Sequence, residues 1–192
     1  YFLLFCSMFA VSTSPLIARY LHHLDPVAIA FWRMLIGAII MHAFSLLNPG
    51  KKNLSHKNSI KTMVAGVLLG LHFAFFYGAI SLLPNNIVNA TVFGTLAPLF
   101  ALLIEIYFGR KIGLHVILGL IIVLSGSFLM FISDFSFNSE LTKGNLLAVT
   151  CSFCFAIVFI LSDNVRQSES AVNFSKFLFS YATLTLFIIS IL

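Results

Sequence analysis

Seven long apolar runs dominate this sequence, and each is about as long as a helix that crosses a lipid bilayer. They cover residues 1–20, 26–47, 62–83, 87–108, 112–132, 145–162 and 177–192. A helix needs roughly 20 predominantly apolar residues to cross the hydrocarbon core. A membrane β-strand would instead show about ten residues of strict alternation. The pattern therefore predicts an all-α membrane protein, a transmembrane bundle of about seven helices.

The composition excludes an ordinary soluble domain. Hydrophobic residues make up 60% of the chain and charged residues 9%, whereas soluble domains carry roughly 25% charged residues. The net charge of +5 does not indicate a nucleic-acid partner, because the basic residues stand in short gaps between the apolar runs. The partner that the composition predicts is the lipid bilayer.

Lys and Arg are divided unevenly between the two sets of loops that alternate along the chain. One set, with the starts of the runs that follow, holds eight: Lys51, Lys52, Lys57, Lys61, Arg110, Lys111, Arg166 and Lys176. The other set holds Lys143 alone. Basic residues concentrate in cytoplasmic loops, so we expect the first set and the N-terminus to be cytoplasmic. Richness in Phe, Ile, Asn and Lys favours a microbial protein, and hence the cell inner (plasma) membrane.

Small residues recur at helical spacing in two of the runs, as they do where membrane helices pack closely. They are Gly66, Gly70, Ala74 and Gly78 in the third run, and Ala90, Gly94 and Ala101 in the fourth. We therefore expect a packed bundle rather than independent anchors.

A weak internal repeat links the two ends of the chain. Phe31, Arg33 and Leu35 have counterparts in Phe174, Lys176 and Leu178. If the sixth run restarts a repeat after five helices, the second copy enters the membrane from the opposite side, as in inverted-repeat transporters. Both ends of the chain lie within apolar runs, and we expect a longer protein. The expected units are residues 1–133, with five helices, and residues 144–192, the start of a second, truncated unit.

An ordered set of short motifs runs through the first five helices. It comprises Asp25-Pro26 with Phe31-Trp32-Arg33, Tyr77-Gly78-Ala79-Ile80, Ala97-Pro98-Leu99-Phe100, and Phe108-Gly109-Arg110-Lys111 with Gly119 and Gly126. This set resembles the drug/metabolite transporter superfamily, EamA-type. The resemblance implies ten helices in two inverted five-helix units around a central substrate cavity. One departure is Arg110, which stands where the family often has Glu.

Arg33 is the leading candidate for substrate binding. It lies seven residues inside the second run, roughly 10 Å from the helix end, where a charge is costly and by default faces the bundle interior or a wet cavity. The alternatives are a side chain that extends to the membrane surface, or a structural pair with Asp25.

Further polar residues of the first, third and fourth runs could line the same cavity. The candidate substrate-binding set is Arg33, His72, Tyr77, Asn89, Thr91, Thr95, Ser12 and Ser14. The alternative for His72 is a neutral ring hydrogen-bonded within the bundle, and for the others ordinary interhelical hydrogen bonding. Pro15 and Pro98 are expected to kink their helices, as a cavity wall or gate or as static kinks. For Glu105 and Arg110 we favour a structural ion pair.

The function that these features predict is secondary transport of a small organic metabolite by alternating access. The alternative is a non-transporting membrane sensor or assembly scaffold built on the same bundle. No phosphate loop, paired central carboxylates or metal-spaced His cluster is present in the sequence, so we expect no enzyme, no cofactor and no metal. A watery polar cavity would favour transport, and a dry packed bundle would favour the scaffold.

Overall fold

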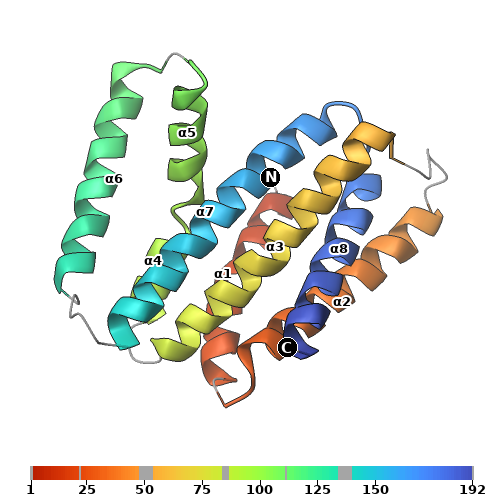
Figure 1. Ribbon diagram of the computed structural model, residues 1–192, viewed down its shortest axis with the longest axis horizontal. Helices are drawn as coiled ribbons and strands as arrows, with labels where there is room; N and C mark the ends of the chain where they lie inside the picture. Colours follow the sequence, from red (N-terminus) through yellow and green to blue (C-terminus); the bar gives the residue numbers. More distant parts are fainter. Residues whose placement is uncertain are drawn as a thin grey trace.

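The computed structural model describes residues 2–21, 23–47, 54–83, 87–110, 112–133 and 140–191. Within them the fold is all-helical, as predicted. The helices are α1 (Phe2–Tyr20), α2 (Pro26–Leu47), α3 (His56–Leu82), α4 (Ile87–Gly94), α5 (Ala97–Tyr107), α6 (Leu114–Ser133), α7 (Glu140–Arg166) and α8 (Ala171–Ile191) (Figure 1).

Five stretches of the described residues are long and apolar enough to cross a membrane. They are Pro26–Leu47, His56–Leu82, Ile87–Tyr107, Glu140–Arg166 and Ala171–Ile191, and Leu114–Leu129 in α6 is a shorter apolar stretch. Large apolar side chains also cover the outside of the bundle, with Ile39, Ile122 and Phe159 each at least 60% exposed. In water this surface would be unfavourable, and in lipid it is solvated. The chain is therefore a helical membrane bundle.

The fourth predicted span is broken, not merely kinked. We predicted one helix over residues 87–108 bent at Pro98, but α4 ends at Gly94 and α5 begins at Ala97. Pro98 lies in the first turn of α5, where a missing backbone N–H costs nothing. The Ser152 hydroxyl of α7 donates a hydrogen bond to the Phe93 carbonyl at the break. The Leu96 N–H also donates to this carbonyl, at 3.4 Å, so that the backbone group is well paired within the membrane.

Helix α3 is the centre of the fold, with α7 on one side and α8 on the other (Figure 1). Gly66 and Gly70 allow the approach of α8. A Cβ added to Gly66 would lie 2.4 Å from the Tyr181 Cβ, and one added to Gly70 would lie 2.9 Å from the Thr185 Cβ. Two backbones can come this close only where one side has no side chain. The predicted close-packing surface is confirmed for these two residues.

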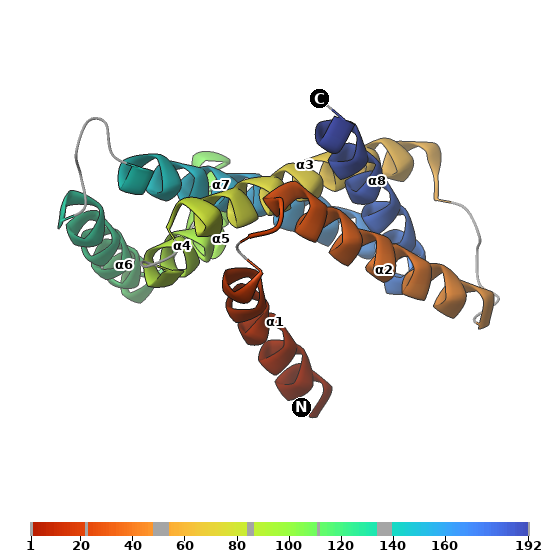
Figure 2. The same cartoon turned by 90° about the horizontal axis from the view of Figure 1, so that it is seen from below.

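Helices α2 and α8 lie side by side and run in opposite directions. The Phe31 and Phe187 rings are 6.0 Å apart, near the start of α2 and the end of α8. At the other end, the Lys176 Nζ donates a hydrogen bond of 3.2 Å to the Ser45 hydroxyl. Figure 2 shows both helices in one layer with α3 and α7, while α1 projects from one face of that layer.

A polar clip joins the start of α3 to the turn between α7 and α8. The Glu169 Oε1 accepts hydrogen bonds from the Ser55 backbone N–H at 3.2 Å and from the Asn58 Nδ2 at 2.9 Å. A carboxylate is favourable at a helix N-terminus because of the helix dipole. This clip fixes α3, α7 and α8 relative to one another at one end of the bundle.

The contact between α3 and α8 generates a stability prediction. We expect Gly66→Ala and Gly70→Ala to destabilise the protein by about 1–3 kcal/mol each, because the added methyl forces the α8 backbone to move. Gly119→Ala and Gly126→Ala on α6 are matched controls, since an added Cβ there meets nothing within 4 Å. Thermal unfolding in detergent, followed by the monomeric fraction on size-exclusion chromatography, measures the effect. Equal melting temperatures for the α3 and α6 variants would contradict this packing.

Candidate functional site

A cavity of about 510 Å³ lies between α1, α2, α3, the α4–α5 break and α7. We call it the central cavity. Its lining residues are Val11, Ser12, Ser14, Pro15, Arg33, His72, Phe73, Phe76, Thr91, Gly94, Thr95, Ala97, Pro98 and Phe155. This volume is in the range of small-molecule sites, which are roughly 300–1,000 Å³.

Arg33 projects from α2 and joins three helices at the edge of this cavity. Its Nη1 donates hydrogen bonds to the Ser14 hydroxyl of α1 and, at 2.8 Å, to the Tyr77 hydroxyl of α3. The two hydroxyl oxygens are 3.2 Å apart. The guanidinium carbon also lies 4.9 Å from the centre of the Phe73 ring, a distance at which cation and ring attract. The guanidinium is thus held by neutral groups.

Asp25 is not the partner of Arg33, although the sequence left that possibility open. The Asp25 carboxylate instead accepts hydrogen bonds from the backbone N–H groups of Val27, at 2.8 Å, and Ala28, at 3.0 Å. It therefore caps the start of α2. Among the described residues, the ion pairs are Arg110 with Glu105 and Lys143 with Glu140. The first is the structural pair that we predicted, and neither includes Arg33.

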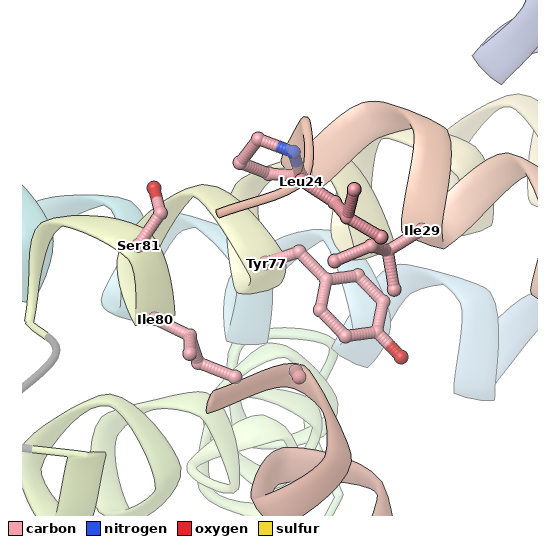
Figure 3. Close-up of a pocket in the computed structure, with 7 residues that line it drawn as sticks. Leu24, Ile29, Tyr77, Ile80 and Ser81 are labelled. Atoms are coloured by element: carbon pink, nitrogen blue, oxygen red, sulfur yellow. The ribbon is translucent and has the colours of Figure 1, made fainter. Parts of the chain in front are cut away.

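A second cavity, of about 310 Å³, shares Arg33 and Ser14 with the central cavity. We call it the side cavity; it is lined by Ser14, Ile17, Ala18, Ile29, Arg33 and Tyr77. A small pocket next to it shares Ala18, Ile29 and Tyr77 and continues to Leu24, Pro26, Ile80 and Ser81. In Figure 3, Leu24 and Ile29 lie against the Tyr77 ring and the Tyr77 hydroxyl points away from Ser81. Arg33 and Ser14 thus form the boundary between the two larger cavities.

His72 lies in the wall of the central cavity and is hydrogen-bonded within the bundle. Its Nδ1 is 2.9 Å from the Cys151 carbonyl oxygen of α7. A carbonyl can only accept, so Nδ1 carries a proton, and Nε2 is an acceptor when the ring is neutral. The ring stacks on Phe155 with centroids 4.6 Å apart. His72 therefore has a structural bond and also a face on the cavity.

The hydroxyl candidates reach the central cavity while bonding to their own helices. Ser12 donates to the Met8 carbonyl at 2.8 Å, Thr91 to the Ile87 carbonyl at 2.8 Å and Thr95 to the Val92 carbonyl at 3.0 Å. Asn89 is half-buried on α4 and lines neither of the two larger cavities. Tyr77 lines the side cavity, and both prolines line the central one.

The aromatic wall of the central cavity was missed by sequence reasoning. Phe73, Phe76 and Phe155 line it with His72. The chain has 22 Phe, so composition cannot say which of them face a cavity. One usable signal was that Phe76 lies four residues after His72, and so lies on the same face of the helix.

The charge in these cavities is positive only. Arg33 lines both, and the described lining residues include no Asp or Glu. Among the described residues, no group of three His, Cys, Asp or Glu side chains is placed to hold a metal ion.

Comparison with known proteins places the chain in a family. The sequence profile of the EamA-like transporter family matches residues 1–132. The chain belongs to the EamA-like transporter family. This membership agrees with the resemblance seen in the motifs of the first five helices and makes the chain a multi-pass membrane protein of a transporter family. Searches of curated proteins and of solved structures gave no match.

Proposed function

We propose that this EamA-like protein is a secondary transporter that moves a small organic metabolite by alternating access, with the central cavity as its substrate site. The observation that carries the proposal is Arg33, a cation at the boundary of two cavities whose hydrogen bonds go to neutral hydroxyls. A charge at this depth in a membrane protein is costly and usually functional. Substrate contacts are assigned to Arg33, Tyr77, Ser14 and His72, and additional lining to Ser12, Thr91 and Thr95.

A sensor or assembly scaffold is the second candidate. It would gain stability from a dry, filled interior, because a void costs packing energy. A cavity of about 510 Å³ with hydroxyl groups and a guanidinium in its wall favours transport over that alternative. We assign no catalytic role and no cofactor to the chain.

We also propose the two-unit organisation, with residues 1–133 as the first unit and 144–192 as the start of an inverted second one. Two observations support it. Helices α2 and α8 run in opposite directions, as an inverted repeat requires of equivalent helices. Arg33 and Lys176, which match in the sequence repeat, each bond a serine and lie within 5 Å of a Phe ring centre.

The transport proposal is tested with a mixture of metabolites, since no single substrate is assumed. Proteoliposomes are loaded with a small-molecule extract of cells, and mass spectrometry identifies compounds that leave faster than from protein-free vesicles. We expect at least one such compound. Arg33→Lys should lose most of this release, because an ammonium group does not reproduce the paired hydrogen bonds of a guanidinium.

The matched control is Arg110→Lys, at an exposed arginine outside both cavities. It should release the compound at the normal rate. Folded yield in detergent is measured for all variants, so that a loss of release at normal yield reports the site. If no compound leaves faster than from protein-free vesicles, the result would contradict the transport proposal. Normal release by Arg33→Lys would remove Arg33 from the site.

We propose further that the start of α3 faces the cytoplasm and the start of α7 faces the other side, in the inner membrane. The uneven distribution of Lys and Arg between the loops supports this orientation. In a cysteine-free variant, Lys57→Cys and Lys143→Cys place single thiols at two exposed positions. A membrane-impermeant maleimide added to intact cells should label only Lys143→Cys. Labelling of Lys57→Cys instead would reverse the orientation.

A further inference from the structure

We infer that the substrate is an organic monoanion with a ring-sized apolar body, and neither a cation nor a zwitterion. This inference rests on the proposed transport function and concerns the same site. The anionic group would bind Arg33 at the boundary of the two cavities, and the body would lie against the aromatic wall formed by Phe73, Phe76 and Phe155.

The charge of the residues that line the two cavities favours an anion. Arg33 lines both cavities, and none of the described residues that line them is an Asp or a Glu. Its hydrogen-bond acceptors are the hydroxyls of Ser14 and Tyr77, which carry no charge. In a medium of low dielectric constant an uncompensated cation strongly favours an anion and disfavours a second cation. The described lining of the two cavities therefore carries one positive charge that no negative charge balances.

The Arg33 guanidinium has donor groups that its hydrogen bonds to Ser14 and Tyr77 do not occupy. Among the described residues, both hydrogen bonds of Arg33 come from Nη1. Nη2 and Nε remain as donors, and neither is a fully buried atom without a partner. A guanidinium presents its donors in a planar fork that matches the two oxygens of a carboxylate. The Ser14 and Tyr77 bonds hold this fork in place, so that little side-chain freedom is lost when an anion binds.

The size and apolar lining of the central cavity suit a ring-sized apolar body. Phe73 lies under the guanidinium, and Phe76 and Phe155 extend the same wall past His72. Val11, Pro15 and Pro98 add further apolar lining. A volume of about 510 Å³ accommodates a ring with a short acid side chain, and burial of the ring gives roughly 25 cal/mol per Å² of apolar area.

The acceptors that line the cavity do not suit a zwitterion. A substrate ammonium group would need a carboxylate or several acceptors, because a buried unpaired charge is strongly unfavourable. The hydroxyls of Ser12, Thr91 and Thr95 already donate to backbone carbonyls of their own helices. Each can accept a bond but offers no negative charge. The Nε2 of His72 is one further neutral acceptor, which is not enough to replace bulk water around an ammonium group.

A matched series of three probes tests the inference. 3-Phenylpropanoate, 3-phenylpropanamide and 3-phenylpropylamine share one skeleton and differ in charge, and phenylalanine adds the zwitterion. Binding to the purified protein in detergent is measured by isothermal titration. We expect the propanoate to bind at least tenfold more tightly than each of the others. Arg33→Gln should abolish that preference, Arg110→Gln should leave it intact, and Phe73→Leu should weaken the propanoate relative to hexanoate.

The outcomes separate the substrate class from the transport function. Equal or tighter binding of the amide, amine or phenylalanine would overturn the inference, as would undetectable propanoate binding at millimolar concentration. An unchanged propanoate affinity in folded Arg33→Gln would overturn it too. In each of these cases, release of a different compound from extract-loaded vesicles would still support the transport function. Selective propanoate binding without release of any compound would support the inference about the ligand and contradict the transport function.

Discussion

The site depends on one guanidinium that is held within the bundle without a carboxylate. Arg33 bonds the hydroxyls of Ser14 and Tyr77 and lies over the Phe73 ring. These contacts lower the cost of a charge at this depth but leave it uncompensated. Without both hydroxyls, the Arg33 guanidinium would keep only its contact with the Phe73 ring. The same contacts attach α1, which otherwise projects from the helix layer (Figure 2), to α2 and α3.

The packing of α3 places this cluster and the cavity. Gly66 and Gly70 bring α8 against one part of α3, and the His72 bond to the Cys151 carbonyl ties α7 to another. Tyr77 is one turn further along and nearly fully buried, so its hydroxyl has a fixed position when it accepts from Arg33. The broken α4–α5 span closes the cavity from the other side, with the Ser152 bond supporting the Phe93 carbonyl at the break. Rigid packing around an open space is what a substrate site requires.

Much of this arrangement follows from the sequence, because a bilayer imposes simple rules. Apolar runs of bilayer length predicted the helices, and α2 begins and ends where its run does. Depth and charge singled out Arg33, and polarity singled out several residues that the structure places around one cavity. Lipid penalises unpaired polar groups so strongly that such residues stand out in an apolar sequence.

The rest depends on tertiary contacts that a single sequence does not display. The role of Asp25 was ambiguous, since a carboxylate before a helix can cap it or pair with a nearby arginine. The interruption near Pro98 was predicted as a kink because Ser152, which supports the broken backbone, is distant in sequence. Phe73 and Phe155 were not selected, because each is one of 22 Phe and only the packing of α3 against α7 distinguishes them.

We propose that the space beside Arg33 is a watery substrate cavity and not a dry packing defect. The most direct measurement is the reaction of Thr91→Cys, in a cysteine-free variant, with a water-soluble, membrane-impermeant methanethiosulfonate reagent. Thr91 lines the central cavity, and Val88→Cys, on the exposed apolar face of α4, is the control. We predict fast modification of Thr91→Cys, slow modification of Val88→Cys, and protection of Thr91→Cys by a compound that the protein releases. Equal, slow modification of both thiols from either side of the membrane would show that the space beside Arg33 is not a watery cavity.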